Sequence, residues 1–215
     1  GTTYTATLTP SGDATYTISV AQNKFTDSSG NNNSASNTFS WTYDSTAPTI
    51  SGVTLASDNT TITVTFDEAV YNTNSGSGSL EVSDFAFALS GGTATLSSTT
   101  PSSISINGNE YTLGISLSGT PNGSETLTVN PVSSSIFDLA GNVASTSQSN
   151  NSISLNDKLA PTITGVTLAS DNSTITVTFS ETVWNYDFNS SGSLEVTDFV
   201  FALSGGTATL SSTTP

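Results

Sequence analysis

A long internal repeat is the feature that most constrains this chain. The segment APTISGVTLASDNTTITVTFDEAV at 47–70 returns at 160–183 as APTITGVTLASDNSTITVTFSETV. A second segment, SDFAFALSGGTATLSSTTP at 83–101, returns at 197–215 with two substitutions. The period of about 113 residues matches one small domain and is far longer than a solenoid repeat. The sequence therefore predicts copies of one domain in series.

Alternating apolar residues predict that this domain is built from β-strands. Hydrophobic residues make up 33% of the chain, a share that usually indicates disorder. Here, however, they recur at every second position in short runs, which favours thin β-layers, and no long stretch has helical periodicity. Short antiparallel strands separated by Gly-, Asn- and Pro-rich turns are typical of an immunoglobulin-like sandwich. We therefore expect an all-β fold of tandem immunoglobulin-like β-sandwich domains in a linear array. The strands of the complete domain are expected at 50–55, 61–66, 85–89, 93–96, 104–117 (bent at Asn107-Gly108), 125–129 and 152–155.

The two ends of the chain are interpreted as halves of a further domain. Strands are expected at 4–8, 16–20 and 39–43, and they match the second half of the complete domain: Tyr4 corresponds to Tyr111, and Asp27-x-x-Gly30-Asn31 to Asp138-x-x-Gly141-Asn142. Phe25 is likewise matched to Phe137. The predicted organisation is a C-terminal half-domain at 1–47, a complete domain at 48–160 and an N-terminal half-domain at 161–215.

Each half-domain alone would leave long strand edges and an apolar face uncovered. Two explanations remain open. The chain can be one period of a longer tandem protein, or separate subunits can join head to tail and exchange their end strands. Both predict a linear assembly in which the partner is another copy of the same sequence.

The charge of the chain restricts its partners. Seventeen acidic residues and two lysines give a net charge of −15. Nucleic acid and anionic membranes are therefore poor partners, whereas cations are good ones; alternatively, the acidity only keeps a polar surface soluble. Cysteine is absent, which removes disulfides and thiolate metal sites. No apolar run approaches the ~20 residues of a membrane span, so no membrane insertion is expected.

Three motifs together resemble a known family. They are Ala-Pro-Thr-Ile at the domain start, Thr-Phe-(Asp/Ser)-Glu-(Ala/Thr)-Val after the second strand, and Asp-Leu-Ala-Gly-Asn before the last. The combination resembles bacterial Ig-like repeats of the type found in surface-layer proteins. The N-terminal part, with Phe-Thr-Asp-Ser-Ser-Gly-Asn, is similar to a sister type from giant repetitive adhesins. The resemblance implies an extracellular structural or adhesive role at the cell surface, calcium sometimes bound between domains, and no catalysis.

Oxygen-bearing side chains are expected to meet where the linker enters the complete domain. In an Ig-like sandwich the loop after the second strand and the loop before the last strand lie at that end. This geometry brings Glu68 and Asp138, together with Asp67 or Asn142, toward Asp44. Ca²⁺ takes roughly six to eight hard oxygen ligands in flexible geometry, and such a joint supplies them.

The next joint is predicted to hold a second group of the same kind. Asp157 and Glu181 would lie there, completed by Asp27 from the other half-domain. The hypothesis is that Ca²⁺ stiffens both joints. The alternative is that Asp138 caps its own turn and Glu68 is simply solvated.

An aromatic loop offers a different kind of site. Trp184, Tyr186 and Phe188 lie close together in a segment whose counterpart, 71–74, is much less aromatic. Exposed aromatic rings stack on sugars, so surface glycans are one candidate ligand. A lateral or interdomain contact is the alternative use.

Catalysis is not expected. The chain has no His or Cys, and its many serines lack an identifiable base apart from Lys24 and Lys158. The carboxylate pairs Glu81/Asp84 and Glu195/Asp198 have the composition of a glycosidase pair, but a solvated strand edge or turn explains them more simply. The sequence thus predicts a non-catalytic structural repeat segment of an extracellular bacterial filament or giant surface adhesin. The rival is a carbohydrate- or protein-binding module that uses the Trp184 loop.

Overall fold

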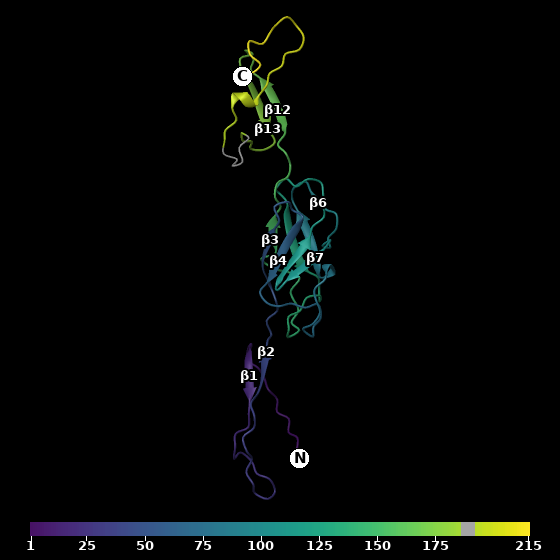
Figure 1. Cartoon of the computed structure of the whole chain (residues 1–215), viewed down its shortest axis with the longest axis vertical. Coiled ribbons are helices and arrows are strands. Elements are labelled where there is room, and N and C mark those ends of the chain that lie inside the picture. Colours follow the sequence, from purple (N-terminus) through teal and green to yellow (C-terminus); the bar gives the residue numbers. More distant parts are fainter. Residues whose placement is uncertain (186–191) are drawn as a thin grey trace. The chain divides into compact units, whose positions relative to one another are not determined.

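The computed structural model describes residues 1–185 and 192–215, and this part of the chain contains β-strands, two 3₁₀ turns and no α-helix. The predicted all-β class is confirmed. The chain divides into two compact units, Gly1–Lys158 and Leu159–Pro215 (Figure 1). Over the same described residues, no helix has the length and hydrophobicity needed to cross a membrane.

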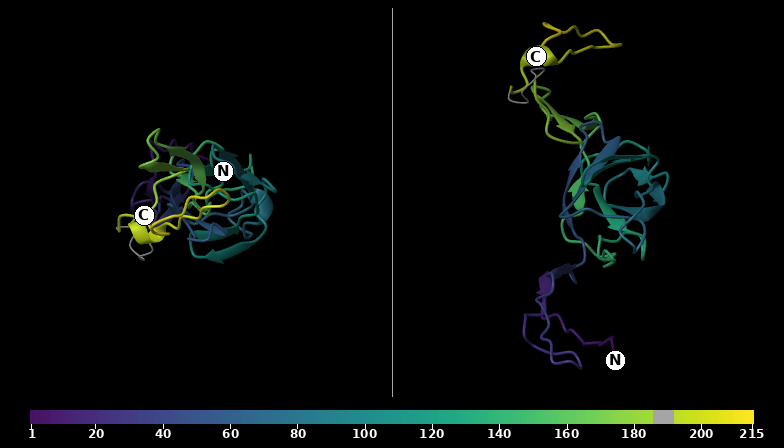
Figure 2. Two further views of the ribbon diagram at one scale, coloured as in Figure 1. Left: turned by 90° about the horizontal axis from the view of Figure 1, so that it is seen from above. Right: turned by 60° about the horizontal axis from the view of Figure 1, so that its bottom comes forward.

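Residues 48–158 of the first unit form a β-sandwich. One sheet has the order β3-β4-β8-β7 and the other has the order β11-β10-β5, and all neighbouring strands are antiparallel. The second view in Figure 2 shows these strands, coloured from blue through teal to green, in two layers. The strands are β3 (Ile50–Leu55), β4 (Thr61–Phe66), β5 (Phe85–Ser90), β7 (Ile104–Asn107), β8 (Glu110–Gly114), β10 (Thr126–Pro131) and β11 (Ser152–Ser154), with a short extra pair β6 (Thr95–Leu96) and β9 (Leu117–Ser118).

The core of the sandwich follows from the alternation in the sequence. In β4 the threonines face outward, while Ile62, Val64 and Phe66 are buried. Phe66 belongs to an aromatic triad with Phe85 and Tyr111, whose ring centroids lie 5.8–6.4 Å apart. Each fully buried side chain of this size contributes about 2 kcal/mol. The other members of the core include Val70, Leu80, Phe87, Leu113, Ile115, Leu127, Val129, Ile136 and Leu155.

The prediction of one bent strand at 104–117 is wrong. The segment forms a hairpin, β7 and β8, in which Ile104 pairs with Leu113 and Asn107 with Glu110. Gly108 has a φ of +60° and is the first residue of the two-residue turn, the position that a hairpin turn of type II′ reserves for glycine. The chain therefore reverses at Gly108 instead of bending, and a separate β9 follows.

The N-terminal part of the first unit is a two-stranded hairpin. β1 (Ala14–Ile18) pairs with β2 (Phe39–Tyr43), so that Ile18 lies opposite Phe39. The strand predicted at 4–8 is not formed. Its counterpart β8 lies between β4 and β7, whereas residues 4–8 have no neighbouring strand. A strand without neighbours gains neither ladder hydrogen bonds nor packing and is not stable in water.

The second unit repeats the first half of the sandwich. β12 (Ile163–Leu168) pairs with β13 (Ile175–Phe179) in the register of β3 with β4, and both pairs carry the same irregularity, between Ile163 and Gly165 and between Ile50 and Gly52. The 3₁₀ turn Val196–Asp198 has the same capping as its counterpart Val82–Asp84. Residues 199–204, the counterpart of β5, form no strand.

Candidate metal site

The Asp138 turn lies between β10 and β11 and is held by its own side chains. Asp138 is fully buried. Its carboxylate accepts the backbone N–H of Asn142 at 2.8 Å and the Asn142 Nδ2–H at 2.7 Å, while its own N–H donates to the Asn142 carbonyl at 3.0 Å. Gly141 has a φ of +92°, and a Cβ there would lie 2.6 Å from the Asn74 carbonyl oxygen, so the motif requires glycine at this position. The predicted capping of the turn by Asp138 is therefore observed.

The same turn is tied to the linker that enters the sandwich. Nδ2 of Asn142 also donates to the carbonyl oxygens of Asp44 and Thr46, at 3.2 and 3.3 Å. One amide group thus connects the turn, its buried carboxylate and the linker. Asn142 was predicted as an oxygen ligand, whereas in the structure it contributes donors to this joint.

Three carboxylates meet at this joint. Ligand oxygens of Asp44, Glu68 and Asp138 lie within 4.8 Å of one another. Burial raises the pKa of Glu68, and the negative charges of Asp138, Asp44 and Asp67 raise it further. The group is therefore an arrangement of like charges that a cation would relieve.

Asp67, the alternative fourth member, has a different task. Its carboxylate accepts the N–H of Thr49 at 2.8 Å and the Thr49 hydroxyl at 2.6 Å, and its own N–H donates to the Thr49 carbonyl at 3.0 Å. These three bonds hold the first residues of the sandwich to the end of β4. Asp67 is not part of the group of three carboxylates, but its negative charge helps to raise the pKa of Glu68.

The second predicted group is not assembled within either unit. Asp157 belongs to the first unit and Glu181 to the second, and both are exposed. Exposed Asp27 forms the same turn as Asp138: its carboxylate accepts the backbone N–H and Nδ2–H of Asn31, both at 2.9 Å. Among the described residues, the only group of three potential ligands is the one at Asp44, Glu68 and Asp138, so the second calcium group stays a prediction.

The two equivalent turns also correct one sequence match. Each Asp follows a residue in an isolated bridge, Thr26 with Asn32 and Phe137 with Val143. Thr26, and not Phe25, is therefore the counterpart of Phe137. The error arose because two aromatic residues were aligned by type, one position out of the register that the turn imposes.

The aromatic loop and the carboxylate pairs are placed only in part. Trp184 is 50% exposed, whereas Tyr186 and Phe188 lie outside the described residues, so the glycan site stays a prediction. In the first carboxylate pair, Asp84 accepts the backbone N–H of Glu81 at 2.7 Å, and the two residues cap the 3₁₀ turn reciprocally. A local capping role accounts for the spacing of this pair.

Sequence reasoning missed Glu125, which is fully buried. Its carboxylate accepts the N–H groups of Thr93 at 2.7 Å, Ala94 at 3.0 Å and Asn122 at 3.0 Å. Burial alone would raise the pKa of Glu125, but these N–H donors outweigh it and lower the pKa. A signal was present in the sequence: an acidic residue lies two positions after a Pro-Asn-Gly turn, where loop N–H groups are free to donate.

Comparisons of this chain with protein-family models, curated proteins and solved structures found no match.

Proposed function

We propose that this chain is a non-catalytic structural segment of an extracellular bacterial filament or giant surface adhesin, built from Ig-like sandwiches in series. The observation that carries the proposal is that the linkers of the sandwich are fastened at opposite ends of it. A chain that enters at one end and leaves at the other transmits tension through the whole domain. Repeating such a domain lengthens the filament, and the fastened linkers make the filament stiff.

The entering linker is fastened at the end of β4. Besides the bonds between Thr49 and Asp67, the N–H of Ile50 donates to Oε1 of Gln148 at 2.9 Å. Pro48 is fully buried, and its ring fixes φ at the point where the sandwich begins. The linker is therefore held by both hydrogen bonds and packing.

The leaving linker is fastened at the opposite end, beside the turn between β3 and β4. The N–H of Asn156 donates to Oδ1 of Asn59 at 2.9 Å, and Nδ2 of Asn59 donates back to the Asn156 carbonyl at 2.8 Å. The N–H of Lys158 donates to the Pro121 carbonyl at 2.9 Å. Tension between the two ends loads the first strand, β3, and the last, β11, in shear, so many hydrogen bonds must break together.

Force spectroscopy on a single tethered chain tests this proposal. We expect one force peak that releases roughly 400 Å of contour length, from about 110 residues extended at ~3.6 Å each. Phe66→Ala should lower the peak, because removing a buried aromatic ring costs about 3–5 kcal/mol. Its counterpart Phe179→Ala, in the second unit, is the matched control and should leave the peak unchanged. Extension without a resisting peak would contradict a mechanical role.

We also propose that the acidic joint binds Ca²⁺. The support is the convergence of three carboxylates with the carbonyl oxygens of Asp44 and Thr46, all hard oxygen donors. The role of the ion would be to hold the entering linker against the loops of the sandwich. The charge balance favours binding, because ionised Glu68 faces three other carboxylates.

Glu68→Gln tests the calcium proposal. Because the folded-state pKa of Glu68 is raised, its ionised form costs stability at neutral pH, and this cost disappears as the pH falls through the folded pKa. With a chelator at pH 7, the variant should therefore unfold at a higher temperature than the parent chain. With calcium at 100 times its Kd, the parent should gain about 2.7 kcal/mol and the variant much less.

Isothermal titration with Ca²⁺ measures the binding directly, with Glu110→Gln as the control at an exposed carboxylate. No heat of binding to the parent chain, or equal calcium stabilisation of parent and Glu68→Gln, would contradict the calcium proposal.

A further inference from the structure

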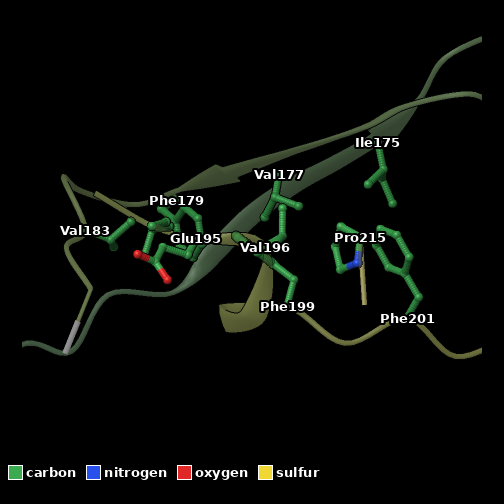
Figure 3. Close-up of a pocket in the computed structure, with 10 residues that line it drawn as sticks. Ile175, Val177, Phe179, Val183, Glu195, Val196, Phe199, Phe201 and Pro215 are labelled. Atoms are coloured by element: carbon green, nitrogen blue, oxygen red, sulfur yellow. The ribbon is translucent and has the colours of Figure 1, made fainter. Parts of the chain in front are cut away.

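The second unit carries an open apolar face. A groove of about 500 Å³ lies between β13 and the segment after the second 3₁₀ turn. Figure 3 shows Ile175 and Val177 of β13 on one side, with Phe199, Phe201 and Pro215 opposite. Ile175 is 42% exposed, whereas its counterpart Ile62 in the sandwich is fully buried. The groove is therefore equivalent to one half of the sandwich core, and it stays open among the described residues of 159–215.

The sandwich shows what covers the equivalent face. There β8 pairs with the outer edge of β4, with Thr63 opposite Thr112 and Val64 opposite Tyr111. The Oγ atoms of Thr63 and Thr112 lie 3.0 Å apart. On the other sheet β10 pairs with β5, so that Leu127 lies opposite Leu89. In the second unit the edge of β13 and residues 199–204 have neither partner.

The N-terminal part of the chain reproduces the missing pieces. In β1 and β2, Ile18 pairs with Phe39 as Leu127 pairs with Ile153 in β10 and β11. The Asp27 turn then repeats the two bonds between the Asp carboxylate and the Asn in the Asp138 turn. One difference is Tyr16, which takes the position of Glu125 and stacks on Trp41 at 5.6 Å.

The apolar side chains of this N-terminal part are unburied. Tyr4 is 88% exposed, whereas its counterpart Tyr111 is 3% exposed. Ile18 and Val20 are 44% and 40% exposed, whereas Leu127 and Val129 are fully buried. The first forty residues thus contain apolar side chains at the positions that fill the core of the sandwich, but here these side chains are exposed.

We propose that the second unit is completed by residues 1–44 of a second copy of this chain, through strand addition at two edges. Residues 3–7 pair with β13, placing Thr5 opposite Thr176 and Tyr4 opposite Val177. β1 and the residues after it pair with 199–204, placing Ile18 opposite Leu203. Tyr4 then completes with Phe179 and Phe199 the triad that Phe66, Phe85 and Tyr111 form in the sandwich.

The strand pairs within the sandwich indicate which segment covers the open face of the second unit. The contacts of β8 with β4 and of β10 with β5 are made within one sandwich, and the two ends of the chain carry the corresponding segments on separated pieces. A contact between different surfaces of two copies leaves one joining surface free at each end of the pair, so further copies add in a row unless the rotation between copies closes a ring. The inference rests on the proposed arrangement of sandwiches in series and specifies how the copies join.

The absence of cysteine permits a direct test with single-cysteine variants. Thr176→Cys and Thr5→Cys are purified separately and mixed under mild oxidation. We expect a disulfide-linked heterodimer in the mixture and little linkage with either variant alone. Thr63→Cys combined with Thr112→Cys in one chain is the positive control, since these positions are paired within the sandwich.

The register is tested by mixing Thr176→Cys with Thr3→Cys. The proposed pairing puts Thr3 opposite Thr178, two residues away, beyond the Cα separation of about 7 Å that a disulfide spans. Equal linkage with Thr3→Cys and Thr5→Cys would overturn the proposal. So would a disulfide that forms within one chain carrying both Thr176→Cys and Thr5→Cys while the mixture forms none.

Tyr4→Ala tests the interface without cysteine. Loss of this ring should weaken association by roughly a hundredfold in sedimentation velocity, as expected for a large aromatic removed from a core. Tyr43→Ala, the same change at a residue outside the proposed core contacts, should have a small effect. Hydrogen exchange should slow at 199–204 as the parent chain is concentrated. A parent chain that stays monomeric contradicts this inference but leaves the single-chain force measurement unaffected, so the two proposals fail separately.

Discussion

At the residue scale, Glu125 shows how a buried charge is accommodated without a basic partner. The chain has two lysines, and the Glu125 carboxylate is instead surrounded by N–H donors from two loops, at 93–94 and at 122. Bonds between backbone N–H groups and an ionised carboxylate are among the stronger hydrogen bonds in proteins. Glu125 therefore fixes the positions of both loops at one end of the sandwich.

We predict that Glu125→Gln destabilises the sandwich by about 2 kcal/mol, because hydrogen bonds to a charged acceptor are worth about 1.5–3 kcal/mol. The folded-state pKa of Glu125 is lowered, so its contribution is present above the unfolded pKa of about 4.3 and is lost as the pH falls through the folded pKa. The variant should lack this part of the acid dependence.

The measurement for Glu125→Gln is hydrogen exchange over residues 48–158 at several pH values. Tryptophan fluorescence does not report on this region, since Trp41 and Trp184 both lie outside it. Glu110→Gln, at an exposed carboxylate, is the control and should change stability by less than about 0.5 kcal/mol. An acid dependence identical to that of the parent would show that Glu125 is not the group responsible.

At the scale of elements, the Asp-x-x-Gly-Asn turn occurs twice with one local geometry and two different surroundings. In both copies the Asp carboxylate accepts the backbone N–H and the side-chain N–H of the Asn four residues later. Only Asn142 also donates to the linker, at Asp44 and Thr46. The motif therefore forms its turn locally, and its contact with the linker is a separate contribution.

We predict that Asn142→Ala loosens the joint while Asn31→Ala does not. Both changes remove one bond to an Asp carboxylate, but only the first removes the bonds to the linker carbonyls, a loss on the order of 1 kcal/mol. Spin labels at Thr15→Cys in β1 and Ser105→Cys in β7 measure the distance across the joint. The distribution should broaden for Asn142→Ala alone, and equal broadening in both variants would assign the effect to the turn.

At the scale of the whole molecule, charge opposes the proposed association of copies. Each copy carries a net charge of −15, and the isoelectric point is about 4.1. The faces that would join are apolar, so the attraction between them is little affected by salt, whereas the repulsion between copies is screened by it.

We therefore predict that association strengthens roughly tenfold when ionic strength rises from about 0.01 M to about 0.15 M, as the Debye length falls from about 30 Å to about 8 Å. Sedimentation velocity at several salt concentrations measures this. Tyr4→Ala should associate weakly at every ionic strength, which separates a specific contact from general loss of repulsion. Association that weakens with salt would indicate an interface held by opposite charges.

Part of this fold could be predicted from the sequence, and particular residues show which features could not. Ile62, Val64 and Phe66 alternate with threonine and form the predicted strand, yet Tyr4, Ala6 and Leu8 alternate equally well and form none. The turn at Gly108 was recognised, but it was interpreted as a bend, whereas Gly108 forms a two-residue hairpin turn and the chain reverses there. A strand is stable only with a neighbour, and alternation does not reveal whether a neighbour is available.

The candidate site was predictable to a similar extent. Glu68 and Asp138 were expected near Asp44 because of where their loops lie in a sandwich, and the structure brings these three carboxylates together. The role of Asn142 as a donor and of Asp67 as a clamp on Thr49 was not foreseen. Residue type identifies an oxygen or a nitrogen, but its orientation depends on neighbours that are distant in the chain.

The sequence by itself determined the repeat, the β-class, the length of the strands β3 and β4 and the positions of the Asp turns, because these depend on alternation and on local hydrogen bonding. The tertiary structure decided which strand edges are paired and which are left open, where the Glu125 carboxylate finds its donors, and which acidic residues meet. Those outcomes depend on contacts between segments far apart in the chain. Residues 199–204, for example, have the sequence of a strand but form none, because no neighbouring strand pairs with them among the described residues.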